Sequence, residues 1–463
     1  MNAAMLTGGR KFGEALRVVE TLRAAGFEAF LAGGCVRDLL LGREPADYDV
    51  ATSATPDVVL DLFERTFAVG AKFGVVLVAP EDAGFVTEVA TFRSDGAYSD
   101  GRRPDAVRYS ESAEEDVQRR DFTINGLLLD PLRASGILEN REQLRAAVLD
   151  YVGGIGDLDA GVVRAIGRAE LRFEEDHLRM LRAVRFAARF GFEIEPGTKK
   201  AIGLLAAKVN GVSRERVRDE LTKMLTEGRA RRAFELLDET RLLNEVLPEI
   251  ARMKGVEQPP QFHPEGDVWI HTLMMLEGLP PGTTPTLGWG VLLHDVGKPP
   301  TFKPPVEPNG RIRFDEHVEV GTRMAEAICR RLRFSNEDTG QIAALVANHL
   351  RFKDVSQMKP STLKRFVRLD RFEEHLALHR LDCLSSHGSL DAYNFVQRFL
   401  AETPPEQVRP PRLLSGEDLK ALGFAPGPPF KAILEVVEEA QLNGKIQTKE
   451  EAVELVLHSF ANK

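Results

Sequence analysis

The chain has 463 residues, a formal net charge of −9, 43% hydrophobic residues and 28% charged residues. This length predicts about three domains, and the ordinary composition excludes the collagen, coiled-coil and disordered classes. No apolar run approaches the roughly 18 residues of a membrane span. Residues 1–10 lack the apolar stretch of a secretory signal, so we expect a cytoplasmic protein with no membrane partner. Cys35, Cys329 and Cys383 are odd in number and far apart, which excludes a disulfide scaffold and a four-cysteine zinc site.

The first part of the chain alternates helix and strand signals. Apolar residues at helical spacing predict helices, and short β-branched runs predict buried strands. The predicted helices cover 11–25 and 36–41, and the predicted strands cover 29–32, 48–51, 74–79 and 85–92. We therefore expect an α/β (α+β) head with a small mixed sheet.

From residue 162 onward the signal is almost wholly helical, and proline-rich breaks interrupt it near residues 258, 304 and 404. These breaks predict a head (1–150), a helical neck (151–255), a further helical domain (256–402) and a helical tail (403–463). The neck is basic: residues 161–234 contain 17 Lys and Arg against 10 Asp and Glu. A basic segment in an acidic chain is typical of an RNA-binding surface, and a solvated helical face with ordinary ion pairs is the alternative.

A glycine pair and three acidic residues in the head predict a phosphate and metal site. Gly33 and Gly34 lie between a predicted strand and helix, where backbone N–H groups approach an anion closely. Asp47 and Asp49 are two residues apart in an extended segment and project from the same face. Neighbouring carboxylates repel unless a cation lies between them, and phosphate oxygens nearby favour Mg²⁺. Glu88 on a neighbouring strand is the third candidate ligand for a two-metal site.

Five ordered motifs carry a family resemblance. They are Gly-Gly-Cys-Val-Arg-Asp with Asp-Tyr-Asp-Val-Ala-Thr (33–38 and 47–52), Arg-Arg-Asp-Phe-Thr-Ile-Asn-Gly (119–126), Gly153-Gly154 through Gly167, Glu-Asp-His-Leu-Arg (175–179) and residues 213–223. Over roughly residues 25–255 the chain resembles class II tRNA nucleotidyltransferases, which comprise CCA-adding enzymes and bacterial poly(A) polymerases. Gly126 departs from the alanine usual in the family.

The resemblance implies a role for each motif. Asp47, Asp49 and Glu88 would hold the catalytic metals. The other implied nucleotide contacts are Gly33, Gly34, Arg37 and Arg120 along the triphosphate and Asp121 and Asn125 at the ribose. The segment 93–103 would form the flexible loop between strands.

Asp176 and Arg179 would select the base in this family. A carboxylate accepts from the exocyclic amine that cytosine and adenine share, and a guanidinium donates to the ring nitrogen beside that amine. Uracil and guanine present a carbonyl at that place and would be rejected. An ordinary i,i+3 salt bridge is the alternative interpretation of the pair.

Helical periodicity places four arginines on one side of the helix that follows Asp176, with Met180, Leu181, Val184 and Ala188 on the other. We expect the arginines to face a cleft or solvent and to contribute to a surface for the tRNA acceptor end. The predicted RNA-binding residues are Arg182, Arg185, Arg189, Arg214, Arg216, Arg218, Arg231 and Arg232.

A second set of candidate ligands lies in the third predicted domain: His271, His294, Asp295, His317, His349 and Asp382. This order resembles the HD phosphohydrolase superfamily, and imidazoles with carboxylates suit a divalent transition metal. Single histidines that pack or cap helices are the alternative. His375, His379 and His387 have no assigned role and are expected on the helical surface.

The predicted function is template-independent addition of CCA to tRNA 3′ ends from CTP and ATP, with release of pyrophosphate by two-metal nucleotidyl transfer. An A-adding enzyme or poly(A) polymerase uses the same chemistry, and residues 69–76 favour the CCA-adding form. The alternative of another class is an HD phosphohydrolase whose head only binds a nucleotide. The oligomeric state is not predicted.

Overall fold

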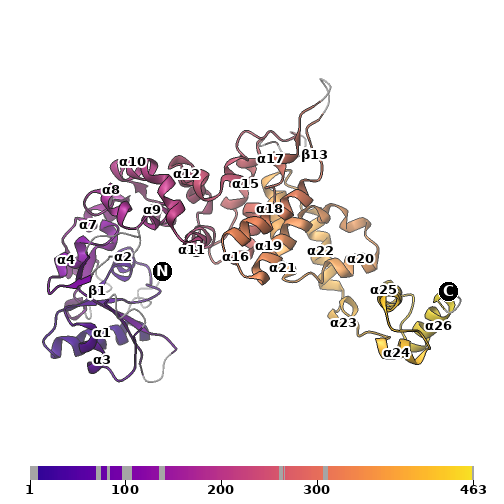
Figure 1. Cartoon of the computed structure of the whole chain (residues 1–463), viewed down its shortest axis with the longest axis horizontal. Helices are drawn as coiled ribbons and strands as arrows, with labels where there is room; N and C mark the ends of the chain where they lie inside the picture. Colours follow the sequence, from indigo (N-terminus) through magenta and orange to yellow (C-terminus); the bar gives the residue numbers. More distant parts are fainter. Residues whose placement is uncertain are drawn as a thin grey trace. The chain divides into compact units, whose positions relative to one another are not determined.

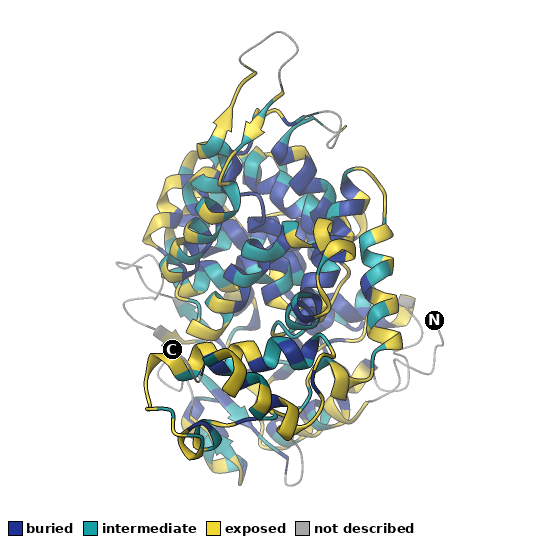
Figure 2. Ribbon diagram, turned by 90° about the vertical axis from the view of Figure 1, so that its right-hand side faces the viewer, coloured by how far each residue is buried: buried dark blue, intermediate teal, exposed yellow. Residues whose placement is uncertain are grey.

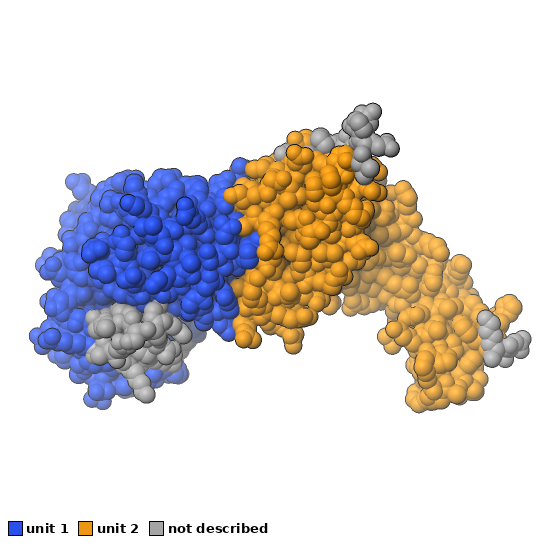
Figure 3. Space-filling model, turned by 45° about the horizontal axis from the view of Figure 1, so that its top comes forward, with its two compact units in different colours: residues 1–248 blue, residues 249–463 orange. Residues whose placement is uncertain are grey.

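The structure is a computed structural model that describes residues 9–68, 74–80, 84–95, 107–134, 141–259, 264, 266–305 and 311–460. The chain divides into two compact units, residues 1–248 and 249–463 (Figure 3). Among the described helices, none combines the length and the hydropathy that crossing a bilayer requires. The predicted loop at 93–103 and the segment 69–76 lie largely outside the described residues. The predicted division at 150, 255 and 402 stays a prediction.

The first unit is built on a mixed seven-stranded sheet with the strand order β3-β4-β5-β2-β1-β8-β9 (Figure 1). The strands are β1 (Ala29–Ala32), β2 (Val50–Thr52), β3 (Thr66–Phe67), β4 (Val75–Val78), β5 (Thr87–Thr91), β8 (Leu127–Leu129) and β9 (Val148–Asp150). Of the sheet's pairs only β2 with β5 is parallel. The predicted α/β head with a mixed sheet is therefore confirmed.

The parallel pair brings two candidate metal ligands together. Val50 lies opposite Val89, so Asp49 and Glu88 each precede the paired residue on neighbouring strands. Residues at equivalent positions of a parallel pair project from the same face of the sheet. This register was not available from the sequence, because β2 and β5 are separated by α3 (Pro56–Leu62), β3 and β4.

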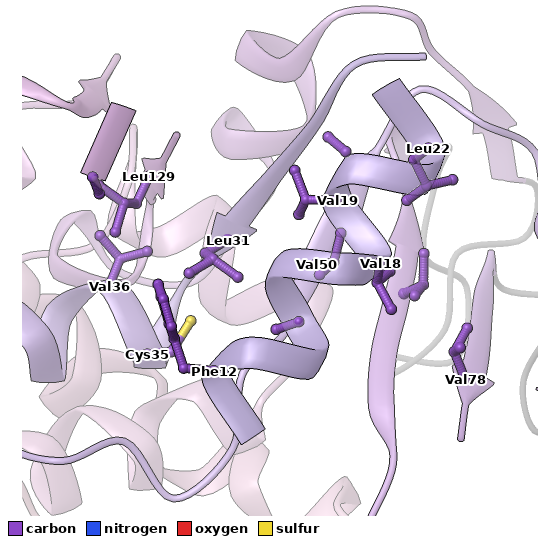
Figure 4. Packing of buried hydrophobic residues seen from close by; sticks show 14 of the residues in the cluster. Phe12, Val18, Val19, Leu22, Leu31, Cys35, Val36, Val50, Val78 and Leu129 are labelled. Atoms are coloured by element: carbon purple, nitrogen blue, oxygen red, sulfur yellow. The ribbon is translucent and has the colours of Figure 1, made fainter. Parts of the chain in front are cut away.

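The apolar side of α1 (Arg10–Ala24) covers one face of the sheet. Phe12, Val18, Val19 and Leu22 point toward Leu31 and Val50 of the sheet, and all of them are buried (Figure 4). The helix α2 (Gly34–Leu40) adds Cys35 and Val36 to the same core. Its entry requires Gly33, whose φ of 73° lies in the left-handed region that side chains disfavour. The helix begins at Gly34, two residues before the predicted start.

The helices of the predicted neck pack around α9 (Leu178–Phe190), which contacts α11 (Arg214–Thr226) and α12 (Ala230–Glu239). Met180, Leu181, Val184 and Ala188 are buried, as the helical periodicity predicts. The other elements of this unit are β6 (Arg93–Asp95), β7 (Val107–Tyr109), α4 (Ala113–Gln118), η3 (Thr123–Asn125), α5 (Pro131–Ala134), α6 (Arg141–Ala146), α7 (Gly154–Ala160), β10 (Val162–Val163), α8 (Ala169–Glu175), β11 (Glu193–Ile194), α10 (Pro196–Leu205), η4 (Ala206–Gly211) and α13 (Leu242–Val246).

The second unit is helical apart from the two-residue strands β12 (Phe302–Lys303) and β13 (Arg313–Phe314). Its helices bury their inward sides and expose their outer sides (Figure 2). The helices are α14 (Pro248–Ala251), α15 (Val268–Glu277), α16 (Pro285–Leu293), α17 (Lys298–Thr301), α18 (His317–Arg331), α19 (Asn336–Asn348), η5 (His349–Gln357), α20 (Pro360–Phe366), α21 (Phe372–Ser385), α22 (Asp391–Glu402), α23 (Pro405–Val408), α24 (Gly416–Ala421), α25 (Pro428–Leu442) and α26 (Lys449–Phe460). Leu419, Ile433, Val437 and Val456 belong to a separate small core formed by α24, α25 and α26.

Two glycines of α7 provide a matched test of packing. A Cβ at Gly154 would lie 2.2 Å from the carbonyl oxygen of Thr123, whereas a Cβ at Gly156 meets nothing within 4 Å. We expect Gly154→Ala to lower the free energy of unfolding by about 2 kcal/mol because the overpacked helix must shift. Gly156→Ala is expected to raise it by about 0.5 kcal/mol through helix propensity. Denaturant unfolding monitored by circular dichroism measures both, and equal shifts would contradict the packing.

Candidate functional site

A cleft of about 700 Å³ in the first unit gathers most of the residues to which the sequence assigns a role. Its walls include Asp47, Asp49, Glu88, Gly33, Gly34, Arg37, Arg120, Asp121, Asn125, Asp176 and Arg179, together with Arg182, Arg185, Arg189 and Arg216. The cleft therefore combines an acidic end and a basic wall. Arg214, Arg218, Arg231 and Arg232 do not line it, within the described residues.

Three carboxylates define the acidic end. Burial, followed by the charges of Glu88 and Asp47, raises the pKa of Asp49 to about 6, although Arg120 opposes the shift. Burial also raises the pKa of Glu88, and Asp47 adds to this. Asp47 is the accessible member, and the Lys11 ammonium lies 3.2 Å from its carboxylate. The negative charges of neighbouring carboxylates repel one another, so a divalent cation bound between them would be stabilised.

Arg120 is held beside the glycine turn by an aspartate that the sequence motifs did not single out. The buried Asp116 accepts from Nε of Arg120 at 3.2 Å and from Nη2 at 2.9 Å, and its other oxygen accepts from Arg119. Burial opposes the charge of Asp116, yet the two arginines lower its pKa. A Cβ at Gly33 would lie 3.0 Å from Nη1 of Arg120, so the glycine lets the turn approach this guanidinium closely. Asp116 precedes Arg119 by three residues and Arg120 by four, which is the spacing of ion pairs on a helix. This spacing could have identified Asp116 from the sequence.

Arg37, which the resemblance predicts along a triphosphate, is held by other groups of the protein. Its side chain is buried, Nε donates to Asp38 at 2.9 Å and Nη1 donates to the side-chain oxygen of Asn125 at 2.5 Å. The guanidinium also lies over the rings of Phe186 and Phe190, 5.2 and 4.6 Å from their centroids. The guanidinium thus braces α2 against α9 while it lines the cleft, and its place along a triphosphate stays a prediction.

Asp121 and Asn125 form a rigid pair at the wall of the cleft. Oδ1 of Asp121 accepts from the backbone N–H of Phe122 at 2.8 Å and from Nδ2 of Asn125 at 3.0 Å. Burial raises the pKa of Asp121, but the charge of Arg182 and the Asn125 amide outweigh it and lower the pKa to about 2. Asp121 is therefore an ionised, acceptor-only group at neutral pH.

The two residues predicted to select the base do not pair with each other within the described structure. The Asp176 carboxylate is bound by both terminal nitrogens of Arg216 on α11, at 3.2 and 2.7 Å. Arg179 donates to Glu175 at 2.5 Å and to the backbone oxygen of Arg119 at 3.1 Å. The i,i+3 salt bridge is thus not formed, and Asp176 and Arg179 each reach the cleft held by a separate partner.

Several of the predicted RNA-binding arginines are engaged in ion pairs. Arg185 is the clearest correction: its side chain is 6% exposed and Nε lies 2.6 Å from the buried Glu220, so it offers no surface for RNA. Arg231 pairs with Glu235 and Arg232 with Glu239 on the same helix, at 2.9 and 2.8 Å. Arg218 pairs with Asp219 at 2.8 Å. For these residues the structure favours the alternative of ordinary ion pairs, because each has a carboxylate within reach on its own helix or a neighbouring one.

The second unit contains two adjoining clusters of candidate metal ligands. His271, His294 and Asp382 form one cluster, and Asp295, His317 and His349 form the other. In each cluster the ligand atoms lie within 4.8 Å of one another. The residues come from α15, the end of α16, the start of α18, the start of η5 and α21, so the fold gathers elements that are far apart in sequence.

The histidines of these clusters are oriented as metal ligands are. Nδ1 of His294, His317 and His349 contacts the backbone oxygens of Val291, Phe314 and Val346 at 2.7–2.8 Å. Within the described part of the chain, the Nε2 atoms of His317 and His349 are buried without a hydrogen-bond partner. A carbonyl on Nδ1 leaves Nε2 as a lone-pair donor, which is the arrangement of metal-bound imidazole.

Charge supports the same interpretation. Burial lowers the pKa of His349 to about 4 and also lowers that of His317, so both imidazoles are neutral at pH 7. Burial opposes the charge of Asp295, but His294 and Lys298 keep its pKa well below the usual range. Lys298, which the sequence did not single out, lies 2.7 Å from Asp295 and is itself buried. Neutral imidazoles with ionised carboxylates fit a divalent transition metal.

Two other histidines correct the expectation of a helical surface. His375 and His379 are buried, and burial lowers the pKa of each to about 4. His379 stacks on Phe352 with ring centroids 4.3 Å apart. Their positions are explained by packing on the inner side of α21, and only His387 is exposed as expected.

Comparison with known proteins agrees with this geometry. The chain matches the poly(A) polymerase head domain over residues 29–164, the probable RNA- and SrmB-binding site of polymerase A over 191–254, and the HD domain over 268–374. It is 37% identical to the CCA-adding enzyme of Latilactobacillus sakei over 296 residues, which cover 63% of this chain and 69% of that enzyme. The chain belongs to the family of CCA-adding enzymes. The predicted family is thereby confirmed.

Other relatives have the same name. The CCA-adding enzyme of Lactobacillus gasseri is 40% identical over 270 residues, 58% of this chain and 64% of that enzyme. For Geobacillus stearothermophilus the values are 42% over 240 residues, 52% of this chain and 55% of the enzyme. The matched segments thus span about half to two thirds of these CCA-adding enzymes.

The structural comparison extends further along the chain. A crystal structure of the Bacillus stearothermophilus CCA-adding enzyme in complex with CTP superimposes with a TM-score of 0.74 at 26% identity, covering 98% of this chain and 99% of the other. The Thermotoga maritima CCA-adding enzyme complexed with tRNA has the same fold, with a TM-score of 0.58 at 19% identity over 99% and 97% of the two chains. The similarity therefore includes the segments beyond the sequence matches.

The histidine clusters generate a metal-binding prediction. We expect His349→Ala to lower the transition metal that copurifies with the full chain, because it removes a ligand with an anchored Nδ1 from one of the two clusters. The exposed His387→Ala is the control and should retain the metal. Inductively coupled plasma mass spectrometry of the purified proteins measures this. Equal metal content in the two variants would contradict the site.

Proposed function

We propose that the protein extends tRNA 3′ ends with CCA, using CTP and ATP and releasing pyrophosphate. The observation that carries this proposal is the single cleft that holds Asp47, Asp49 and Glu88 together with Asp176 and Arg179. The first group suits nucleotidyl transfer and the second suits recognition of a base. The names of the relatives, and the CTP and tRNA held by the neighbouring structures, support the same reaction.

The chain's own residues divide the work of this reaction. Asp47, Asp49 and Glu88 would hold Mg²⁺, which when bound supplies activation of the RNA 3′-hydroxyl and stabilisation of the pyrophosphate. Arg120, fixed by Asp116, lies beside the glycine turn and neutralises phosphate charge there. Asp121 and Asn125 contact the ribose.

Base selection depends on the fixed orientation of Asp176 and Arg179. Arg216 and Glu175 hold these two groups before any nucleotide binds. A carboxylate that accepts from an amine and a guanidinium that donates to a ring nitrogen match cytosine and adenine and mismatch uracil and guanine. Preorganised partners lower the cost of orienting the two side chains when the nucleotide arrives.

The nucleotide preference distinguishes this proposal from its alternatives. We expect tRNA lacking all three terminal nucleotides to be extended by CTP alone, and tRNA lacking only the terminal A to be extended by ATP alone. Electrophoresis of labelled tRNA with each nucleoside triphosphate singly measures this. Extension by ATP alone on all substrates, or long A tails, would indicate an A-adding enzyme or a poly(A) polymerase.

The acidic end is tested by a matched pair of aspartates. Asp49→Ala is expected to lower nucleotide addition by at least about a hundredfold, because it removes a carboxylate that holds the metal ions. Asp61→Ala, an exposed carboxylate on α3 outside the cleft, should leave addition unchanged. Single-turnover addition of CTP to tRNA is the measurement, and near-normal addition by Asp49→Ala would reject the two-metal mechanism.

The histidine clusters favour a second activity, hydrolysis of phosphoesters in the second unit. The two adjoining clusters, one with His294 and the other with Asp295, can each hold a divalent ion, which when bound activates water. Asp295 is central because its two oxygens face different clusters: Oδ2 lies 3.1 Å from His294 and Oδ1 lies 3.9 Å from His349.

Substitution of Asp295 separates the two proposed activities. Asp295→Asn is expected to abolish hydrolysis of bis(p-nitrophenyl) phosphate and 2′,3′-cyclic AMP in the presence of Mn²⁺ or Ni²⁺ while CCA addition persists. Asp49→Ala should do the reverse. Release of nitrophenol and adenosine monophosphate measures hydrolysis. Loss of both activities in either variant would show that the two sites are not independent.

A further inference from the structure

Among the arginines of α9 in the described structure, Arg182 is the one whose ion pair reaches the wall that carries Asp121. Its Nε donates to Oδ2 of Asp121 at 2.8 Å, and its Nη2 lies 2.8 Å from the same oxygen. The next arginines of α9 have other partners, since Arg185 contacts Glu220 and Arg189 contacts Glu227. Arg182 therefore joins the base-selecting helix α9 to the wall that carries Asp121 and Asn125.

Arg182 holds one of the two oxygens of Asp121, and groups of the cleft wall hold the other. A carboxylate offers about four lone-pair directions. Three are taken by Phe122 N–H, Asn125 Nδ2 and Arg182 Nε, the first two on Oδ1 and the third on Oδ2. Nη2 of Arg182 lies 2.8 Å from Oδ2 as well, so Arg182 holds this oxygen with two nitrogens. The orientation of Arg182 thus decides where a sugar hydroxyl can donate to Asp121.

Arg182 itself is fixed by packing. Its guanidinium lies over the ring of Phe186, 5.2 Å from the centroid, and the side chain is about one third exposed. The opposite side of the network is closed by Arg37, which holds the oxygen of Asn125 and thereby turns its Nδ2 toward Asp121. The chain Arg182–Asp121–Asn125–Arg37 is therefore a continuous brace at the cleft wall.

Electrostatics makes Asp121 depend on this brace. Asp121 is only 9% exposed, and burial alone favours the neutral form of its carboxyl group. Arg182 is the largest of the charges that keep its pKa low. Without Arg182, Asp121 would lose both its direction and part of its ionisation, and with them its ability to accept from a hydroxyl.

We propose that Arg182 is a positioning residue that selects ribonucleotides over 2′-deoxyribonucleotides by holding Asp121, and that it is not an RNA contact. The inference rests on the proposed function, in which Asp121 accepts from the ribose. A pocket built to pair with a hydroxyl discriminates strongly against the analogue that lacks it, and the discrimination weakens when the pairing group is misdirected.

The test compares CTP with dCTP. Single-nucleotide addition to tRNA lacking CCA gives kcat/KM for each, and the ratio measures sugar selection. Arg182→Gln is expected to lower this ratio by at least about tenfold, mostly through loss of CTP addition, because an oriented bond to a charged group is lost. Arg182→Lys keeps the charge without the two-nitrogen contact and should lower the ratio less. This variant tests the inference even if the glutamine variant does not fold.

A double-mutant cycle distinguishes positioning from general damage. Asp121→Asn alone should lower the CTP/dCTP ratio, and adding Arg182→Gln to it should lower the ratio no further, because both act through one carboxylate. Arg145→Gln is the control, since Arg145 pairs with Asp159 at 2.9 Å outside the cleft. This control should leave the ratio and the rate unchanged.

Filter binding of tRNA tests the competing assignment. The inference requires that Arg182→Gln leave the tRNA affinity and its salt slope unchanged, whereas loss of a phosphate contact would weaken binding and lower the slope by about one. An unchanged CTP/dCTP ratio, an additive double mutant or weaker tRNA binding would each overturn the inference and leave the proposed function standing. Failure of the unmodified protein to add CTP would overturn both.

Discussion

Burial of carboxylates in one cleft is the constraint on which the first unit depends. A buried carboxylate requires a cation or several donors, and the first unit supplies an arginine to several acidic groups in and beside the cleft. Asp116 has Arg119 and Arg120, Asp121 has Arg182, and Asp176 has Arg216. Asp49 differs, because burial, followed by the charges of Glu88 and Asp47, raises its pKa to about 6 although Arg120 opposes the shift. Asp49 forms no ion pair among the described residues, so its position suits a metal ion.

These arginine–carboxylate pairs join the helices of the predicted neck to the cleft, so the helices form part of its wall rather than a separate surface. Phe186 and Phe190 of α9 stack parallel to each other and carry the guanidinium of Arg37 from α2. Arginine on an aromatic face is held by both dispersion and the ring quadrupole. The groups that we propose to select the base and to contact the sugar thus share one support, and much of the positive charge of the predicted neck is used inside the unit.

In the second unit, backbone carbonyl groups fix the orientation of the candidate histidine ligands. Val291, Phe314 and Val346 each fix one imidazole through Nδ1, so that Nε2 faces the cluster. The glycine contact between α17 and α18 brings these elements close: a Cβ at Gly297 would lie 2.1 Å from the backbone oxygen of His317. The proposed metal centre in this unit is therefore built by helix ends and close packing, which orient the candidate ligands.

The sequence alone determined the elements and the residue types of the sites. Periodicity predicted the buried side of α9, the motifs predicted Asp47, Asp49 and the family, and the ordered histidines predicted the ligand clusters, because these signals are local or repeat at fixed spacing. The partners were decided only by the tertiary structure. Arg37 and Arg185 are buried in the cleft wall, Asp176 pairs with Arg216, and His379 is packed against Phe352. The sequence does not show whether an arginine binds a phosphate or a carboxylate, because its partner lies on another element whose position depends on the whole fold.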